Sequence, residues 1–158
     1  NPIVASSRSI KTLEANMIMF YTNQKRNSET VLKNQYKIKK KQFENLKKLK
    51  DLVGISKDII LNKNFRAKEF GILLNRNWEL KKKINRLSSN KLVDKYYNQA
   101  LNLGAYGGKL LGAGGGGFVL FLVPPNKKKK FLKFFSKYLH VPFRVDNSGS
   151  QIVYYSKN

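Results

Sequence analysis

Apolar and polar positions along the chain predict a succession of strands and helices. Two largely apolar runs, residues 13–21 and 118–123, have the length and composition of buried strands. Between them, apolar residues recur every three or four positions, which is the spacing of one face of a helix. This spacing predicts long helices over residues 27–52, 65–87 and 91–103.

Cap and breaker residues set the limits of these helices. The polar residues 27–30 can supply an N-cap for the first long helix. Gly54 is expected to break that helix, and Ser56 to begin a short helix that ends at Leu61. Gly104 is expected to cap the C-terminus of the helix over residues 91–103.

The last part of the chain contains both the helical and the strand spacing of apolar residues. Residues 126–138 place aromatic side chains at helical spacing, and we expect those rings to be core residues. Two short strands are predicted over residues 141–145 and 151–155, on either side of the turn signal at 146–149. The order of elements predicts an α+β sandwich with several helices packed on an antiparallel sheet.

Composition narrows the class of protein. With 158 residues the chain can form one domain that buries roughly 70% of its unfolded surface. The absence of cysteine excludes disulfides and thiolate metal sites, and the single histidine, His140, argues against a histidine metal centre. No apolar run approaches the ~20 residues of a membrane span, and residues 1–9 lack the pattern of a secretory signal. A cytoplasmic location is the expectation.

The charge is strongly unbalanced. Lysine and arginine number 32 against 9 aspartate and glutamate residues, which gives a formal net charge of +23. Such a charge attracts polyanions, including nucleic acids. The lysines are spread over several segments, and asparagine and isoleucine abound with them, as a compositional bias would also produce. Dedicated polyanion binding and a solvated lysine-rich surface therefore both stay open.

A glycine-rich tract at residues 107–117 carries the main chemical signal. The spacing Gly112-x-Gly114-x-x-Gly117 matches the dinucleotide-binding fingerprint, but that fingerprint must open a helix, and here a strand follows. A phosphate-binding P-loop is excluded because no Gly-Lys-Ser/Thr closes the tract, and Lys109 precedes it. Backbone N–H groups in such a loop can still form an anion-binding concavity.

The tract resembles a motif of a known family. Residues 108–118 are similar to the third motif of the GHMP small-molecule kinases, which include galactokinase, homoserine, mevalonate and phosphomevalonate kinases. Weaker likenesses to the members that phosphorylate sugars at the anomeric position are Phe20-Tyr21-Thr22 with Arg26, residues 78–82, and residues 141–144 with 149–151. The family has glycine after the threonine of the first strand. This chain has Asn23, which tolerates the left-handed backbone that such a turn requires.

The resemblance implies a ferredoxin-like fold and a kinase activity. Residues 1–158 would form a single domain, the C-terminal, substrate-side half of the enzyme, without the N-terminal half that holds ATP and Mg²⁺. The implied reaction transfers the γ-phosphoryl group of ATP to the anomeric hydroxyl of D-glycero-D-manno-heptose 7-phosphate. This half alone is expected to be inactive, with no catalytic residue and no metal ligand. A fucose or galactose kinase, or a basic nucleic-acid-binding module that kept the fold, are the alternatives.

Several residues are candidates for the site. The glycine loop would line the substrate pocket with Gly112, Ala113, Gly114, Gly115, Gly116 and Gly117. Thr22, Arg26 and Lys109 are the candidate substrate-binding residues, and Lys81 is added by resemblance alone. The expected partners are a sugar phosphate and the N-terminal half of the kinase, with non-specific polyanion binding and no membrane.

Overall fold

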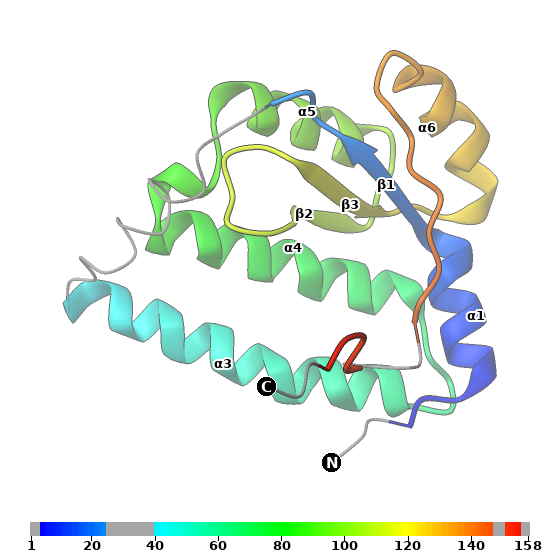
Figure 1. Ribbon diagram of the computed structural model, residues 1–158, viewed down its shortest axis with the longest axis horizontal. Helices are drawn as coiled ribbons and strands as arrows, with labels where there is room; N and C mark the ends of the chain where they lie inside the picture. Colours follow the sequence, from blue (N-terminus) through cyan, green and yellow to red (C-terminus); the bar gives the residue numbers. More distant parts are fainter. Residues whose placement is uncertain (1–3, 25–39, 147–150, 156–158) are drawn as a thin grey trace.

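A computed structural model describes residues 4–24, 40–146 and 151–155 of the chain (Figure 1). Helix α1 (Ser7–Asn16) leads directly into strand β1 (Met17–Tyr21). The later elements are α3 (Lys40–Leu61), α4 (Ala67–Ile84), α5 (Lys91–Asn102), β2 (Gly107–Leu110), β3 (Phe118–Leu122) and α6 (Lys128–Phe134), with 3₁₀ turns at Arg86–Ser88 and Pro125–Lys127.

Strand β3 is the centre of a three-stranded antiparallel sheet of order β1-β3-β2. Met17 of β1 and Gly107 of β2 both pair with Leu122 of β3. The chain after α6 returns along the other edge of β1, where the Tyr21 N–H donates to the Leu139 carbonyl at 2.9 Å. The predicted α+β class, with helices on an antiparallel sheet, is confirmed.

The core lies on both faces of this sheet. The larger cluster joins β1 and β3 to α5 and α6, and Phe20, Phe121, Phe131 and Phe135 are in ring contact within it. A smaller cluster places Leu122 against α1 and α4. Helix α3 packs on the outer side of α4 (Figure 1). The prediction that the aromatic residues of 126–138 are core residues is confirmed for Phe131 and Phe135 and wrong for Phe134, which is 48% exposed; Tyr138 is partly buried against the cluster.

The predicted strand over residues 13–21 is wrong in its first half, because residues 13–16 close helix α1. The hydroxyl of Ser6 caps this helix by accepting from the Ser9 N–H. Burial then recurs at Ser9, Leu13 and Asn16, which is the period of a helix rather than of a strand. A short apolar run alone does not distinguish a helix from a strand, and here the N-terminal cap favours the helix.

The predicted break at Gly54 is also wrong, since α3 continues through it to Leu61. Gly54 is exposed, and a methyl group placed on it would meet no atom within 4 Å. Glycine costs about 1 kcal/mol relative to alanine in a helix interior, and the packing of α3 on α4 offsets that cost. The part of the predicted helix before residue 40 lies outside the described residues.

The end of the chain departs most from prediction. Residues 141–145 form no strand, and the pairing with β1 is reduced to one bridge between Phe20 and His140. Pro142 lacks the N–H that a longer ladder needs. Residues 151–155 are exposed and not in a strand. Strand β2 was not predicted, and the helix expected over 126–138 is a 3₁₀ turn followed by the shorter α6.

Candidate functional site

The glycine loop connects β2 to β3, and its backbone favours glycine at four positions. Gly112, Gly114, Gly115 and Gly117 have φ angles of 73°, 112°, 78° and 98°. These values lie in the left-handed region, which side chains with a Cβ atom rarely adopt. The concentration of glycine in the sequence is thus explained by the shape of the loop.

Side chains from two helices hold carbonyl groups of the loop. The ammonium of Lys81, on α4, donates to the carbonyl oxygen of Gly112 at 2.6 Å. The side-chain amide of Asn90, which precedes α5, donates to the carbonyl oxygen of Gly115 at 2.8 Å. The loop is therefore fixed at two points by donors from separate elements.

The end of β1 holds the loop at a third point. The hydroxyl of Thr22 donates to the Gly117 carbonyl at 2.8 Å, and the Thr22 N–H donates to the same oxygen at 2.8 Å. In return, the Gly117 N–H donates to the Gln24 carbonyl at 3.1 Å. Asn23 between them has a φ of 55°, so the left-handed turn expected at this departure from the family pattern is kept.

Backbone segments approach the loop so closely at Gly114 and Gly116 that no side chain would fit there. A Cβ atom on Gly114 would lie 2.7 Å from the Cα of Ser88, and one on Gly116 would lie 2.4 Å from the Gln24 carbonyl oxygen. The Gly115 N–H donates to the Ser88 carbonyl at 2.7 Å. Within the described part of the chain, the N–H groups of Ala113, Gly114 and Gly116 donate to no acceptor. Gly114 is buried, whereas Ala113 and Gly116 are partly exposed, so the N–H groups of Ala113 and Gly116 are the candidates to bind a ligand.

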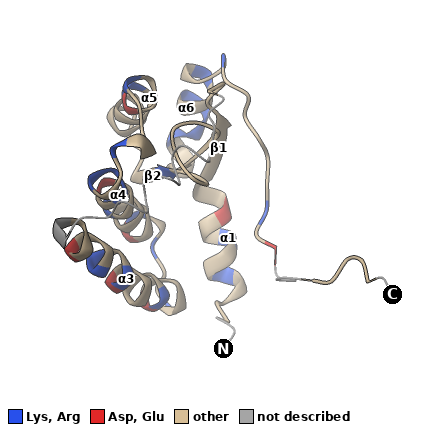
Figure 2. Ribbon diagram, turned by 60° about the vertical axis from the view of Figure 1, so that its left-hand side comes forward, with Lys and Arg blue, Asp and Glu red and all other residues tan. Residues whose placement is uncertain are grey.

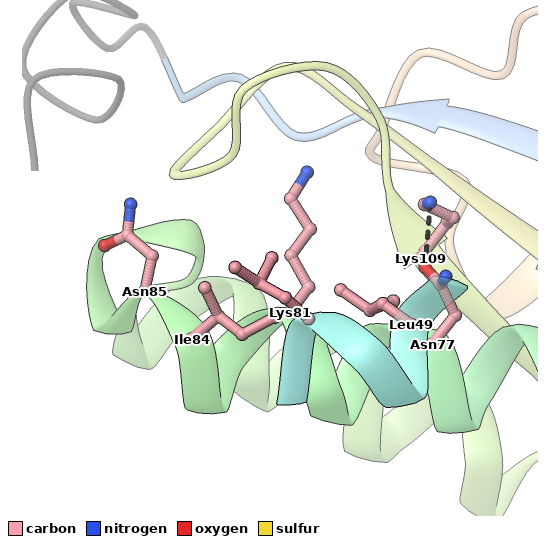
Figure 3. A pocket seen from close by; sticks show the side chains of 7 residues that line it. Leu49, Asn77, Lys81, Ile84, Asn85 and Lys109 are labelled. Carbon is pink, nitrogen blue, oxygen red and sulfur yellow. Dashed lines mark hydrogen bonds between the residues drawn. The ribbon is translucent and has the colours of Figure 1, made fainter. Parts of the chain in front are cut away.

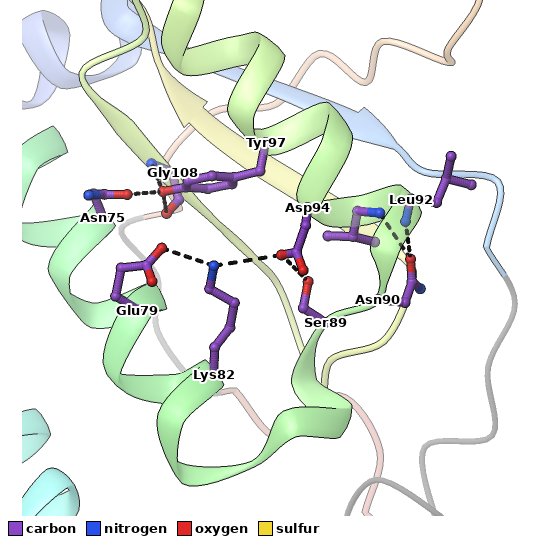
Figure 4. A network of polar contacts seen from close by, with 10 residues as sticks. Asn75, Glu79, Lys82, Ser89, Asn90, Leu92, Asp94, Tyr97 and Gly108 are labelled. Atoms are coloured by element: carbon purple, nitrogen blue, oxygen red, sulfur yellow. Dashed lines mark hydrogen bonds and ion pairs between the residues drawn. The ribbon is translucent and has the colours of Figure 1, made fainter.

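Asn90 lies next to a network of polar contacts at the start of α5 (Figure 4). Its side-chain oxygen accepts from the N–H groups of Leu92 and Val93 at 3.0 and 2.9 Å, which caps α5. The neighbouring Ser89 hydroxyl lies 2.8 Å from Asp94 Oδ1. Lys82 lies 3.6 Å from the same oxygen of Asp94, and this pair ties α4 to the start of α5.

Tyr97 of α5 fixes the strand that leads into the loop (Figure 4). Its hydroxyl oxygen lies 2.8 Å from the carbonyl oxygen of Gly108, accepts the Gly108 N–H at 3.1 Å, and lies 2.6 Å from Asn75 Oδ1. Burial raises the pKa of the Tyr97 hydroxyl well above its ordinary value. The group is therefore protonated and serves as a structural hydrogen-bonding centre.

A cavity of about 330 Å³ lies beside the glycine loop, between α3, α4 and β2 (Figure 3). Leu46, Leu49 and Ile84 form its apolar wall. Its polar lining comes from Asn77, Asn85, Lys81 and Lys109, and the ammonium of Lys109 donates to Asn77 Oδ1 at 2.9 Å. No aspartate or glutamate is among the described residues that line it.

Both lysines of the cavity have a pKa below the ordinary value. Burial lowers the pKa of Lys109, and burial together with the positive charge of Lys109 lowers the pKa of Lys81. Loss of hydration and mutual repulsion both disfavour the charged forms. An anion between the two ammonium groups would favour their charged forms and so oppose both effects.

The structure brings together some of the predicted site residues. Thr22 is buried against the loop, Lys109 lines the cavity, and Lys81 connects the cavity to the loop through Gly112. Their binding of substrate stays a prediction, and Arg26 lies outside the described residues. Asn90 was not predicted, although a polar residue before an apolar helix is a readable N-cap signal.

The described residues contain no group of three or more histidine, cysteine, aspartate or glutamate side chains that could hold a metal ion. Their helices are too short or too polar to cross a bilayer. The positive charge is spread over several helices rather than gathered on one (Figure 2).

Helices packed on an antiparallel sheet, with a glycine loop beside a cavity lined by two lysines, define an α+β domain with a preformed pocket. The family model described as GHMP kinases C terminal matches residues 59–141, more than half of the chain. The chain therefore belongs to the C-terminal domain family of the GHMP kinases, and its fold is of that type.

Individual relatives agree with this assignment. The chain is 34% identical over 119 residues to the D-glycero-alpha-D-manno-heptose 7-phosphate kinase of Campylobacter jejuni, covering 72% of this chain and 34% of the relative. It thus spans about a third of that protein. The mevalonate kinase of Methanococcus jannaschii has a similar structure, with a TM-score of 0.68, 28% identity, and coverage of 90% of this chain and 43% of that one.

A sugar kinase of known structure shares the fold. The D-glycero-D-manno-heptose 1-phosphate kinase of Bacteroides thetaiotaomicron matches with a TM-score of 0.60 and 23% identity. The match covers 91% of this chain and 37% of that one. At this identity the likeness concerns the fold alone.

Proposed function

We propose that this chain is the substrate-side domain of a kinase that phosphorylates the anomeric hydroxyl of D-glycero-D-manno-heptose 7-phosphate. The family and the heptose 7-phosphate kinase relative support the reaction and the sugar. The observation that carries the proposal is the glycine loop. Its carbonyls at Gly112, Gly115 and Gly117 are engaged by side chains, while the N–H groups of the partly exposed Ala113 and Gly116 donate to no described residue and would be donors to an anion.

The residues of this chain would bind and orient the sugar phosphate. Catalysis of phosphoryl transfer is mostly positioning and stabilisation of charge, so a preformed loop of N–H donors contributes without reorganisation. Thr22 would act by holding the loop through Gly117, and Lys109 would contribute positive charge. ATP would supply the phosphoryl group and Mg²⁺ would neutralise its charge, with both held mainly by the N-terminal half of the kinase.

Binding of the sugar phosphate to the chain tests this proposal. Calorimetric titration with D-glycero-D-manno-heptose 7-phosphate should show saturable binding that Gly114→Ala weakens at least tenfold, because the methyl group would collide with Ser88. Gly54→Ala is the matched control, since its methyl group meets open space and its binding should be unchanged.

Two outcomes would contradict the proposal. One is the absence of saturable binding to the unaltered chain, and the other is equal affinity in Gly114→Ala and Gly54→Ala. A nucleic-acid-binding module would instead bind DNA with an affinity that falls log-linearly and steeply with salt, and Gly114→Ala would leave that binding intact. That result would favour the alternative function.

A further inference from the structure

Lys81 and Lys109 place two ammonium groups in one small cavity without a lining carboxylate among the described residues. Lys81 reaches the cavity from α4 and Lys109 from β2, and Figure 3 shows both side chains on the side of the glycine loop. Among the described residues, Glu79 and Asp94 pair with Lys82, at 2.9 and 3.6 Å, rather than with Lys81 or Lys109. The charge of the pair is therefore not neutralised within the cavity.

Each ammonium retains hydrogen-bonding capacity. A lysine has three N–H donors, and the described residues accept one from Lys81, at the Gly112 carbonyl, and one from Lys109, at Asn77 Oδ1. The bonds that are made orient the two groups, and the remaining donors can reach a ligand. A polyvalent anion with several acceptor oxygens satisfies this arrangement better than water or chloride does.

The rest of the cavity restricts the ligand that carries the anion. A volume of about 330 Å³ lies at the lower end of the range for small-molecule sites, which favours a compact molecule. The amide group of Asn77 lies beside Lys109, and Leu46 and Ile84 supply an apolar wall against which a carbon chain can lie. A phosphorylated polyol combines these features.

We propose that the cavity between α3, α4 and β2 binds the phosphate monoester end of the sugar phosphate, held between Lys81 and Lys109. This assignment rests on the proposed function, and it places the non-reacting phosphate beside the glycine loop. The two lysines then determine specificity, because they distinguish the phosphorylated sugar from the free sugar. Neither residue takes part in the transfer itself.

The experiment compares a phosphorylated ligand with its unphosphorylated counterpart. The chain is titrated with D-glycero-D-manno-heptose 7-phosphate and with D-glycero-D-manno-heptose, and with inorganic phosphate as a separate probe. Lys109→Gln should weaken binding of the 7-phosphate at least tenfold while changing binding of the free sugar less than twofold. Lys109→Arg should restore most of the affinity, since it keeps the charge.

A second cationic depression provides the matched control. Arg8, Lys63 and Arg66 line a depression of about 250 Å³, but all three are exposed and Arg66 pairs with Glu69. Lys63→Gln removes the same charge as Lys109→Gln and should leave every affinity within twofold. A similar loss in both variants would mean that net charge alone attracts the ligand, and would overturn the proposal.

The remaining outcomes separate this inference from the proposed function. If the 7-phosphate does not bind, but inorganic phosphate shifts the NMR signals of Lys81 and Lys109 and Lys109→Gln abolishes that shift, the proposed sugar is wrong and the anion site stands. If Lys109→Gln weakens the free sugar and the 7-phosphate equally, the lysine is structural and the site is overturned. Absence of any effect of phosphate on either lysine would also overturn it.

Discussion

The side chain of Asn90 joins the start of helix α5 to Gly115 of the glycine loop. Its oxygen accepts from the helix and its nitrogen donates to the Gly115 carbonyl at 2.8 Å. One side chain thus performs two tasks that use different atoms. The two tasks can be separated by substitution.

Asn90→Asp should keep the helix cap and lose the hold on the loop. Aspartate caps helices as well as asparagine does, but it has no N–H to donate and places negative charge against the Gly115 carbonyl. We expect the free energy of unfolding to stay nearly unchanged, while amide hydrogen exchange at Gly115 accelerates and affinity for the sugar phosphate falls severalfold. Asn90→Ala should lose both functions and about 1 kcal/mol of stability. Identical stability and identical exchange in the two variants would contradict this division.

Tyr97→Phe should destabilise the domain by about 1–3 kcal/mol, because the Gly108 backbone and the Asn75 side chain would lose their hydrogen-bond partner. Urea unfolding followed by fluorescence measures this directly, since Trp78 is the single tryptophan and is fully buried. Tyr21→Phe is the control, because the Tyr21 ring packs on Phe118 at 5.2 Å and its hydroxyl makes no hydrogen bond to another described residue. Equal effects of the two substitutions would contradict the role assigned to Tyr97.

Lys109→Met should remove part of the pH dependence of stability. The pKa of Lys109 in the folded chain lies below its ordinary value of 10.5, so the unfolded chain binds more protons between the lowered pKa and 10.5. The free energy of unfolding therefore rises with pH in this window, and below it the charged lysine destabilises the fold. The slope of urea-derived stability against pH should be smaller in Lys109→Met than in the unaltered chain. The exposed Lys91→Met serves as the comparison, and a slope equal in both variants would argue against the shift.

The same shift predicts how anion binding depends on pH. A bound phosphate favours the charged ammonium and raises the pKa of Lys109 and Lys81 toward 10.5. Affinity for the 7-phosphate should accordingly fall as the pH rises through the lowered pKa values. Titrations at several pH values above neutrality, each paired with Lys109→Gln, would measure this. An affinity that does not change with pH in the unaltered chain would contradict it.

Gly54→Ala should stabilise the domain by about 0.5–1 kcal/mol. Gly54 lies inside α3, is exposed, and has space for a methyl group, so alanine gains helix propensity without a clash. Thermal and urea unfolding would both detect the gain. Destabilisation instead would mean that α3 is not a continuous helix at this residue.

The elements that were predicted correctly are those whose apolar patterns extend over many residues. Helices α4 and α5 and strand β3 follow extended apolar periodicities, and these were confirmed. Strand β2 was missed because two of its four residues are glycine, and its pairing with β3 and Tyr97 is not visible in its own sequence. The predicted strand before Met17 and the predicted helix break at Gly54 were wrong, because a helix cap and a packing partner outweighed the local sequence preference.

The glycine loop of the candidate site was predictable from the sequence, and Thr22, Lys81 and Lys109 were named as site residues, but the contacts that these residues make were not predictable. Consecutive glycines before a strand pointed to the loop, because few other structures require them. The groups that hold it, Asn90 and Thr22, are separated from it by 25 and 95 residues, and no local pattern links them to the loop. The cavity was equally invisible, since Lys109 and Lys81 become neighbours only when β2 packs on α4.

The pairing of β1 with β3 has a consequence for the order in which the domain folds. Paired residues of β2 and β3 lie as few as about 10 positions apart, whereas those of β1 and β3 lie roughly 100 apart. Closing the longer loop costs about 2 kcal/mol more in chain entropy. The hairpin and its helices should therefore form first, with β1 docking late. Because Thr22 arrives with β1, the glycine loop would reach its final shape only at the end of folding.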